Sequence, residues 1–472
     1  MIETIYGDIM NRERRNINFA LKSNGMTEIE FFETEIAAFK KSKLREDMIN
    51  GNKYYAGKQD ILNRKITSIG ENGQLQEVKT AINNKIVDNQ YANAVDKKVN
   101  YLASKPITIN CDDKNYLKAL NEIFNDNFHL TLKNIAQNCL NNGICYAHVY
   151  YDCSGQLGFK IIPGYEVIPF WADSDHTVLD KAVRVYNAFG YEGFNSVVIE
   201  KVEIYSEDGV EFYELKNGKL IPDVNQNNAS YIVYENKHGD HEEYSWGKIP
   251  LIAFKYNNIE QPLIDRVKSL QDSLNLIMSD FQNNMEESPR NTILVLKNYA
   301  GANLGEFRQN LNTYGVVKVT TIDGIAGDVE TLRIEVNSEN YKVIIKELKN
   351  AIIENARSYD AKDDRLGGNP NQLNILSMYS DIDLDASGME SEFQASLKQL
   401  LYFINIHLLE SGVGNFNNTK VNFVFNRNTM VNTSEIIENC IKSSSILSQE
   451  TILSNHPWVK DAFAEIKNKA EP

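Results

Sequence analysis

Two regular stripes of apolar residues limit what this chain can fold into more than any other feature. In the first stripe, the steps are four, three, four, three and four: Leu263, Val267, Leu270, Leu274, Ile277 and Phe281. The second stripe slips by one step near its end: Tyr341, Ile345, Leu348, Ile352, Ala356 and Tyr359. This spacing predicts two helices with one apolar side, each on the order of 30–35 Å long.

The segment between the stripes carries strand and helix patterns of its own. Within residues 288–336, "NTILVLKNY", "GVVKVTTI" and "VETLRIEV" predict strands, and "LGEFRQNLN" predicts a short helix. This layout indicates a two-helix stalk with a small α/β head. An antiparallel helical hairpin inside a core would show the same stripes. A thin stalk buries only one side of each helix, so its stability would require packing against other copies of the chain.

The remaining sequence predicts an α+β protein. Residues 1–50 are typical of helices, and Thr27 with Glu30 forms a capping box. "NNKIVDNQYANAVDKKVNYLASKPITI" predicts a helix followed by a short strand, and residues 114–142 predict more helix. Alternating, aromatic-rich β segments run from Tyr146 to about Pro250. The C-terminal part predicts a helix from about Leu373 to Ser411, a strand in "KVNFVFNRN", and helices over 433–470 with N-caps at Ser434, Ser448 and Ser454.

Length and charge restrict the class of protein. The 472 residues are too many for one compact core, and their 42% hydrophobic and 24% charged composition is typical of globular domains. The formal net charge is −15. A protein that holds nucleic acid tightly usually has a basic surplus, so any DNA contact should be loose or confined to small basic patches. No window approaches the ~18 apolar residues of a membrane span, and we expect a soluble chain without a signal peptide.

Metal and cofactor motifs are weak. The five cysteines include no C-x-x-C pair, which favours reduced thiols. His238 and His241 lie in "KHGDHEEYSWG", where turn chemistry explains them as well as a metal does. An EF-hand-like spacing occurs at Asp381, Asp383, Asp385, Ser387 and Glu392. Because Ala386 replaces the glycine that the calcium loop requires, we interpret this stretch as a solvated acidic helix face. We predict no cofactor and no metal.

A polar loop, "DDRLGGNPNQLNIL" at residues 363–376, interrupts the helical section. Gly367 and Gly368 permit positive φ, and Pro370 stops helical continuation. A phosphate cradle, a hinge and a surface turn are the three readings. The sequence has no G-x-x-x-x-G-K-[ST] motif, and this loop follows a helix and lacks the P-loop lysine. The phosphate cradle is therefore disfavoured. No nucleophile–base motif occurs either, so an enzyme is the weaker hypothesis.

Several segments occur in the order of one protein family. They are "NGNKYYAGKQDIL", the helix–strand segment from Asn83, "WGKIPLIAFKYN", "VLKNYAGANLGEFRQNL" with "VETLRIEV", and "SEIIENCIKSSSILSQETILSNHPWVKDAFAEI". On these segments, the chain resembles the portal proteins of long-tailed double-stranded DNA bacteriophages, in the siphophage-type large portal family. The resemblance extends from about residue 30 to 470. It implies a portal fold in a ring, twelvefold in the virion, at one capsid vertex, through which DNA is packaged and ejected.

The resemblance also implies a division of the chain. The parts are a wing (1–258), a first stem helix (259–287), a clip (288–337), a second stem helix (338–360), a tunnel loop (361–376), a long kinked helix with the return strand of the wing (377–431), and a C-terminal crown (432–472). The implied partners are other copies of the chain, double-stranded DNA bound without sequence preference, the terminase large subunit, the head–tail connector, and the major capsid and scaffold proteins. No membrane is implied. Assembly would take place in the bacterial cytoplasm.

Candidate site residues follow from these assignments. The tunnel-loop residues predicted to face DNA are Lys362, Asp363, Asp364, Arg365, Gly367, Gly368, Asn369, Asn371 and Gln372. Stem cations that could centre a duplex are Lys342, Lys346 and Lys349, although surface charges with no DNA role are equally consistent with their spacing. The predicted stem-packing residues are Leu263, Val267, Leu270, Leu274, Ile277, Phe281, Ile345, Leu348 and Ile352.

Two other functions stay open. A packaging enzyme such as a nuclease or ATPase would require a Walker motif or clustered metal carboxylates, and the sequence offers neither. A structural ring in a defective prophage or phage-tail-like particle would use the same fold without passing DNA. The sequence does not distinguish this second function from a DNA conduit.

Overall fold

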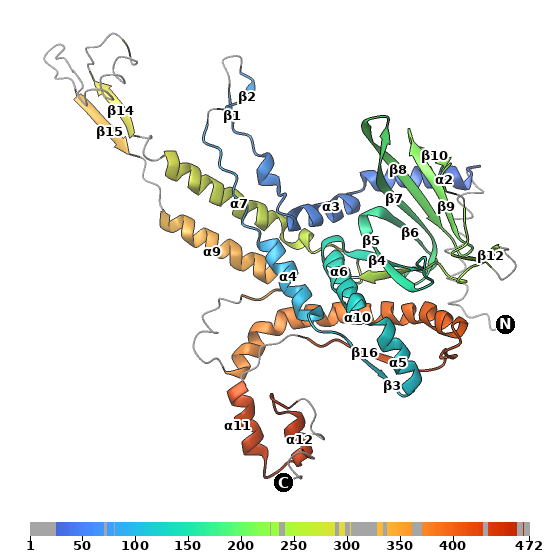
Figure 1. The fold of residues 1–472 in the computed structure, drawn as a ribbon. Coiled ribbons are helices and arrows are strands. Elements are labelled where there is room, and N and C mark those ends of the chain that lie inside the picture. The colour runs from blue at the N-terminus through green and yellow to red at the C-terminus, as the bar shows by residue number, and fades with distance from the viewer. Residues whose placement is uncertain are drawn as a thin grey trace. The chain divides into compact units, whose positions relative to one another are not determined.

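A computed structural model of the chain describes residues 25–69, 73–79, 81–226, 228–235, 241–287, 292–297, 303, 328–333, 338–360, 371–427, 433–459 and 466. The chain divides into two compact units. Figure 1 labels their helices and strands. Unit 1 comprises Met1–Gly57, Asn89–Lys268 and Ile353–Pro472, and unit 2 comprises Lys58–Asp88 and Ser269–Ile352. In the part of the chain that is described, no helix combines the length and the apolar character that a membrane crossing requires.

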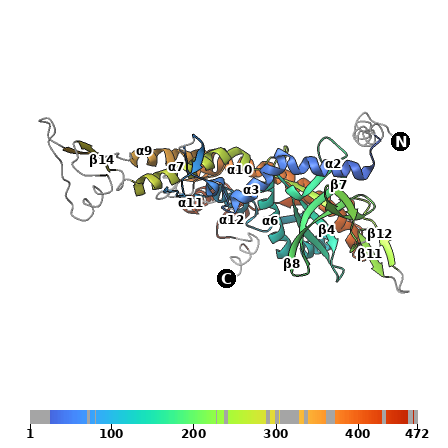
Figure 2. The same ribbon diagram turned by 90° about the horizontal axis from the view of Figure 1, so that it is seen from above.

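A five-stranded antiparallel sheet forms one part of unit 1 (Figure 2). Its strand order is β10-β9-β8-β7-β6. The strands are β6 (Val167–Trp171), β7 (Leu179–Glu192), β8 (Asn195–Tyr205), β9 (Val210–Lys216) and β10 (Lys219–Pro222). β7 and β8 form a long hairpin in which Val185 faces Val202 and Val183 faces Ile204. These β-branched pairs lie on one face of the sheet, which therefore requires a cover.

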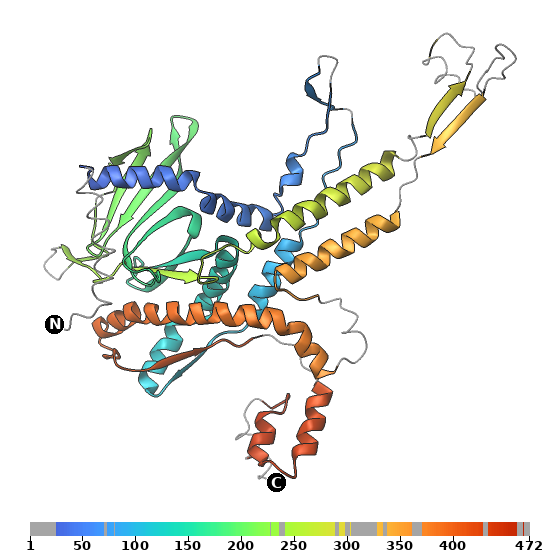
Figure 3. The same ribbon diagram turned by 180° about the vertical axis from the view of Figure 1, so that it is seen from behind.

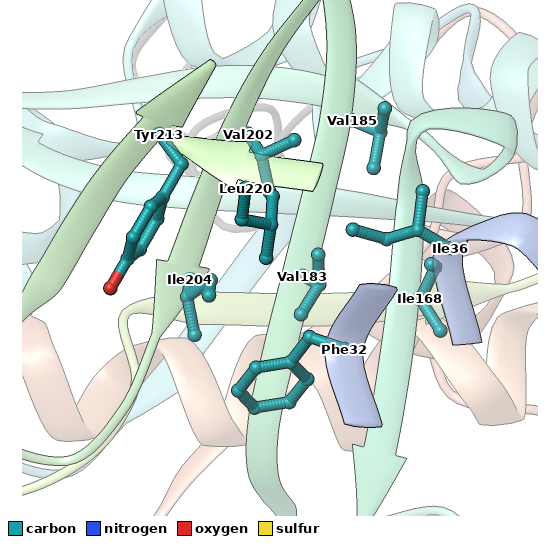
Figure 4. Packing of buried hydrophobic residues seen from close by; sticks show 9 residues of the cluster. All are labelled: Phe32, Ile36, Ile168, Val183, Val185, Val202, Ile204, Tyr213 and Leu220. Atoms are coloured by element: carbon teal, nitrogen blue, oxygen red, sulfur yellow. The ribbon is translucent and has the colours of Figure 1, made fainter. Parts of the chain in front are cut away.

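Helix α2 (Glu28–Lys41) covers that face (Figure 4). Its buried residues Phe32 and Ile36 are four apart and so project from the same side of the helix. They pack against Ile168, Val183 and other sheet residues. The capping box predicted at Thr27 and Glu30 is confirmed, because each side chain bonds the backbone N–H of the other residue. The predicted cap thus sets the start of α2, and the spacing of Phe32 and Ile36 sets its buried side.

A second, three-stranded sheet lies in the same unit. It has the order β13-β4-β5, with β4 at Ile144–Tyr151, β5 at Leu157–Pro163 and β13 at Leu251–Lys255. Helices α3 (Lys43–Tyr55) and α6 (Asp126–Asn142) pack on each other beside it. At their contact a Cβ on Gly51 would lie 2.0 Å from the Asn141 carbonyl oxygen, so this close backbone approach requires glycine.

The longest helix of unit 1 is α10 (Gln372–Glu410), within one residue of the predicted bounds. Near it lie α4 (Gln90–Ala103), α5 (Lys114–Ile123) and the strand pair β3 (Thr108–Cys111) with β16 (Val421–Val424). Two short helices follow, α11 (Thr433–Ser443) and α12 (Gln449–Ser454). All five cysteines are free, as predicted. A further hairpin pairs β11 (Ile232–Glu235) with β12 (His241–Tyr244), so His241 begins a strand, and His238 lies outside the described residues.

Only one of the three predicted serine N-caps holds that position. Ser448 caps α12 by accepting a hydrogen bond from the Thr451 N–H. Ser434 lies inside α11, and Ser454 is the last residue of α12, so these two predictions are wrong. The Ser454 hydroxyl instead donates to the Glu450 carbonyl one turn earlier, at 2.8 Å. Serine also makes this backward bond within helices, so a serine near a helical pattern does not by itself locate the N-cap.

Unit 2 contains most of two long helices. α7 (Ile264–Glu287) and α9 (Ser338–Asn355) lie side by side (Figure 3), and their residues from Ser269 and up to Ile352 belong to this unit. Beyond them, β14 (Thr292–Lys297) pairs with β15 (Asp328–Arg333). The predicted strand "GVVKVTTI" and helix "LGEFRQNLN" lie outside the described residues. α7 begins later than the predicted residue 259, and α9 ends before the predicted residue 360.

Unit 2 also contains the segment Lys58–Asp88. It contains the 3-10 turn η1 (Asp60–Asn63), a hairpin of β1 (Thr67–Ile69) with β2 (Leu75–Glu77), and a non-helical run at 83–88. The prediction that a helix starts near Asn83 is wrong. α4 starts at Gln90, where the Asn89 side chain accepts a hydrogen bond from the Ala92 N–H as its N-cap. We call residues 83–88 the strap.

Candidate functional site

The predicted stem-packing residues lie on α7 and α9 or directly next to them. Leu263 and Val267, in unit 1, are fully buried. In unit 2, two of the predicted residues are fully buried and five are half-buried: Leu274 and Ile352, then Leu270, Ile277, Phe281, Ile345 and Leu348. The two helices touch where the Phe281 and Tyr341 rings lie 5.0 Å apart, and Asn284 donates to the Tyr341 hydroxyl at 2.9 Å.

A second stripe on α7 is polar and buried, and sequence reasoning missed it. Its members recur every four residues and are all less than a tenth exposed: Gln271, Asn275, Ser279 and Asn283. Each bonds the strap. Gln271 donates to the Asp88 carbonyl at 2.7 Å, and Asn275 accepts from the Asp88 N–H at 3.0 Å. Ser279 accepts from the Ile86 N–H at 3.0 Å, and Asn283 accepts from the Asn84 N–H at 2.8 Å.

The spacing of this polar ladder has a geometric cause. Four residues of α-helix rise about 6.0 Å, and two residues of extended chain advance about 6.6 Å. From Asn275 to Asn283, every fourth side chain of α7 therefore meets every second backbone amide of the strap, which runs in the opposite direction. In the sequence, the only sign of this ladder was the repeat of polar residues at positions 271, 275, 279 and 283. Amide and hydroxyl residues on a helix are usually exposed, so the signal is easily read as surface.

Two ion pairs connect residues 58–88, the segment that contains the strap, to α7 and α9. Lys349 of α9 lies 2.6 Å from the Asp88 carboxylate, and Arg64 lies 2.6 Å from Asp280 of α7. Of the three predicted stem cations, Lys349 thus has a partner in its own chain. Lys342 pairs with Glu339 at 2.8 Å, three residues away on α9, and Lys346 is exposed. The assignment of these lysines to DNA stays a prediction.

The outer surfaces of the two helices carry apolar side chains. On α7 these are Leu276 and Met285, and on α9 they are Val343 and Ile344. Val343 is 59% exposed. α7 therefore buries amides and a hydroxyl against the strap while it exposes leucine and methionine. This distribution is the reverse of what water favours for an isolated soluble helix.

A buried carboxylate joins four segments of unit 1. Asp385 of α10 has a side chain that is only 8% exposed, and Lys98 of α4 lies 2.6 Å from it. Tyr256 donates its hydroxyl to Asp385 at 2.7 Å. Arg266, in the first turn of α7, and Arg357, just after α9, lie 3.4 and 3.6 Å away. We call Asp385, Lys98, Tyr256, Arg266 and Arg357 the Asp385 junction.

The junction corrects the prediction of a solvated acidic face on this stretch. Asp381 is exposed, but the side chain of Asp385 is only 8% exposed, and Asp383 is paired with Arg427 and accepts from the Tyr101 hydroxyl at 2.7 Å. Burial by itself would raise the pKa of Asp385, but Lys98, Tyr256 and Arg266 hold it below its usual range. Burial lowers the pKa of Lys98 to about 8, although Asp385 opposes that shift. Among the described residues, no group of three or more His, Cys, Asp or Glu side chains is arranged to hold a metal.

The end of α9 has an unusual residue at its turn. The Arg357 N–H donates to the Glu354 carbonyl and the Ser358 N–H to the Ile353 carbonyl, both at 2.9 Å, which is a Schellman C-cap. Such a cap requires a left-handed residue, usually glycine, and here Arg357 has φ +49°. An L-residue pays about 1–2 kcal/mol for that conformation. Some interaction of the arginine side chain or its backbone must offset this cost.

Two consecutive lysines of α4 hold the chain that leaves α9. Lys98 donates to the Arg357 carbonyl at 3.1 Å, and Lys97 donates to the Tyr359 carbonyl at 2.7 Å. The Tyr359 ring packs on Tyr379 of α10, with centroids 4.6 Å apart. The direction of the chain from α9 towards residue 360 is therefore fixed by contacts with both α4 and α10.

Comparison with known proteins identifies the family. The sequence profile described as "Phage portal protein, SPP1 Gp6-like" matches residues 40–471. The chain belongs to this portal protein family. It is similar to the portal protein of Bacillus phage SPP1, with 28% identity over 431 residues that cover 89% of this chain and 82% of the relative. It is also similar to the portal protein of Clostridium phage phiCD119, with 25% identity over 431 residues that cover 88% and 90% of the two chains.

Most residues of the predicted portal tunnel loop lie outside the described residues: Lys362, Asp363, Asp364, Arg365, Gly367, Gly368 and Asn369. The last two predicted residues lie at the start of α10. Asn371 is the N-cap and accepts from the Asn374 N–H at 2.8 Å, and the Gln372 N–H donates to the Glu435 carboxylate at 2.7 Å. An acidic side chain at a helix N-terminus is favourable, so Glu435 of α11 stabilises the point where the described chain resumes.

Proposed function

We propose that this portal family member forms a dodecameric ring at one vertex of a phage capsid and serves as the conduit for DNA packaging and ejection. The single observation that carries the proposal is the family match, which spans residues 40–471 and so nearly the whole chain. In this proposal the chain is a structural channel and not an enzyme. Its location is the virion, after assembly in the bacterial cytoplasm.

The exposed apolar residues of α7 and α9 support ring formation. Leu276, Met285, Val343 and Ile344 face solvent in the single chain. Burial of such residues is favourable by about 25 cal/mol for each Å² removed from water. In a ring each chain meets its two neighbours through different surfaces, so the paired helices of adjacent copies would cover these residues.

Charge supports a conduit more than a tight DNA-binding protein. Twelve chains with a net charge of −15 each give a total on the order of −180, which discourages adhesion of phosphates. Lys342 and Lys349 have carboxylate partners within the chain, which leaves the exposed Lys346 as the stronger candidate to centre a duplex. The tunnel-loop residues keep their proposed role beside the DNA.

The proposed partners are the terminase large subunit, the head–tail connector, and the major capsid and scaffold proteins. Imaging of the purified chain by negative stain tests the ring directly. We expect particles with a central hole and about a dozen lobes. A stable monomer in native buffer would contradict the proposal. An ATPase and nuclease assay on the same preparation tests the enzyme alternative, for which we expect no activity.

Deletion of Gly367–Asn371 tests the conduit as distinct from the ring. We expect the variant to form rings of normal appearance, while heads assembled with it contain no DNA. Heads that fill normally would show that these residues are not the tunnel loop. Wild-type heads that never contain DNA, despite normal rings, would favour a structural ring in a defective particle.

A further inference from the structure

The Asp385 junction lies where the chain leaves α9 and approaches α10. Three cations and one hydroxyl surround one carboxylate, and they come from α4, the residue after β13, the first turn of α7 and the second residue after α9. Since the carboxylate is buried, loss of any close partner cannot be replaced by water as it could at a surface. The junction is thus a rigid point of contact between segments that are distant in sequence.

Arg357 is the least expected member of the junction. Glycine would form the same C-cap without strain, yet the chain has an arginine at φ +49°. Its side chain is 56% exposed and lies 3.6 Å from Asp385, while its carbonyl accepts from Lys98, the other partner of Asp385. Lys98 therefore contacts both the turn that ends α9 and the middle of α10. This arrangement ties the position of that turn to α10.

We propose that Lys98, Arg357 and Asp385 act as positioning residues that fix the end of α9 against α10, and thereby fix both ends of the chain between residues 360 and 371. Because that chain is the proposed tunnel loop, this inference rests on the proposed function. The first end is held at Arg357 and Tyr359 by Lys98 and Lys97. The second end is held through α10 itself, which runs without interruption from Gln372 to Asp385. DNA that moves past the loop would thus act on a chain with both ends fixed.

The variant Arg357→Gly separates positioning from folding. Glycine removes the guanidinium from the junction and also relieves the left-handed strain, so we expect a melting temperature equal to or above that of the wild type. Spin labels on the exposed positions Glu354 and Leu376 report the distance between α9 and α10 in full-length chains diluted with unlabelled chain. Cys111 and Cys153 are replaced by serine for this purpose. We expect one narrow distance distribution in the wild type and a broader one in R357G.

Lys98→Met is the second variant, and Lys98→Arg is its conservative partner. We expect K98M to broaden the distribution and K98R to restore most of its width. Lys201→Met is the matched control, because Lys201, like Lys98, is a lysine with two acceptors within its own unit, here the carboxylates of Glu214 and Asp223 at 2.8 and 2.7 Å. It lies in the five-stranded sheet and is predicted to leave the distance unchanged. A folded R357G variant with the wild-type distribution would overturn the positioning role.

DNA packaging supplies the functional readout. We expect heads built with R357G to contain at least about fivefold less DNA than the wild type, which is the lower end of typical coupling between sites. Normal packaging despite a broadened distance would overturn the link between the junction and the loop. If the wild-type chain forms no ring at all, the proposed function fails, while the distance measurement still decides whether the junction positions α9.

Discussion

Two helices of this chain cover a neighbouring segment by opposite means. α2 covers the five-stranded sheet with Phe32 and Ile36, whereas α7 covers the strap with Gln271, Asn275, Ser279 and Asn283. Apolar burial gives much free energy but tolerates sliding, because it is not directional. Each hydrogen bond of the polar ladder contributes less to the free energy of folding than a buried apolar side chain does. However, each bond joins one particular donor to one particular acceptor, so it is lost if the strap slides along α7. The comparison shows that the first contact provides stability and the second provides register.

The largest loss of stability is expected when an apolar side chain between α2 and the five-stranded sheet is truncated. Phe32→Ala removes a ring that is 3% exposed and that lies 5.6 Å from the Phe170 ring. We expect the free energy of unfolding of unit 1 to fall by about 3–5 kcal/mol, as for other buried aromatic residues. Denaturant unfolding followed by circular dichroism measures the loss. A loss below about 1 kcal/mol would show that α2 is not a required cover.

The second largest effect is expected on lowering the pH, which should destabilise unit 1 but leave the hydrogen bonds between α7 and the strap unchanged. Burial lowers the pKa of His148 on β4 to about 4, although Glu203 opposes the shift. Below pH 6.5 the unfolded chain gains a proton at His148 that the folded chain does not, so stability falls from about pH 6.5 to about 4. We expect unit 1 to lose about 2–3 kcal/mol over this window, and His148→Phe to remove that loss.

The ladder residues of α7 are amides and a hydroxyl, which do not titrate between pH 4 and 6.5. Hydrogen exchange at Asn84 and Ile86, corrected for the intrinsic effect of pH, should therefore stay constant while unit 1 weakens. If the protection of these amides falls together with the melting temperature of unit 1, the two regions are not independent in the way the comparison requires.

A single deleted hydroxyl tests the ladder. Ser279→Ala removes the acceptor of the Ile86 N–H and changes almost no volume. We expect a cost of about 1–2 kcal/mol, seen as roughly tenfold faster exchange of the Ile86 amide. Ser273→Ala is the matched control, because Ser273 is exposed on the same helix and its hydroxyl donates only to the Ser269 carbonyl among the bonds described. Equal effects of the two substitutions would refute the register role.

The smallest effect is expected on the outer side of α9. Lys342 is exposed and pairs with Glu339 on the same helix. Lys342→Ala should change stability by less than about 0.5 kcal/mol, because exposed ion pairs are screened by water and salt. Thermal unfolding at low and high salt checks this. A larger loss in assembled rings than in isolated chains would indicate that Lys342 contacts a neighbouring copy.

The sequence predicted features that depend on local rules. The Thr27–Glu30 capping box and the helical stripes of α7 and α9 follow from the spacing of residues along one helix. The ladder and the Asp385 junction did not follow from spacing alone, because each depends on a partner far away in sequence. Nothing near Asp385 indicates that Lys98 of α4 will lie beside it. At the strap the Asn89 N-cap was a local signal for a later helix start, but the pairing of 83–88 with α7 was not visible in the sequence.

The strap has a further consequence for how long such a ladder can be. A step of four residues turns an α-helix by about 400°, so each rung lies about 40° further around the axis than the one before. The chain laid on Gln271 through Asn283 must therefore wind about a third of the way around α7. The strap also runs ahead of the helix by roughly 0.6 Å at each step of the ladder. Over the two steps from Asn275 to Asn283 the offset is roughly 1.2 Å, so each further step would bring the strap amides further out of register with the side chains of α7.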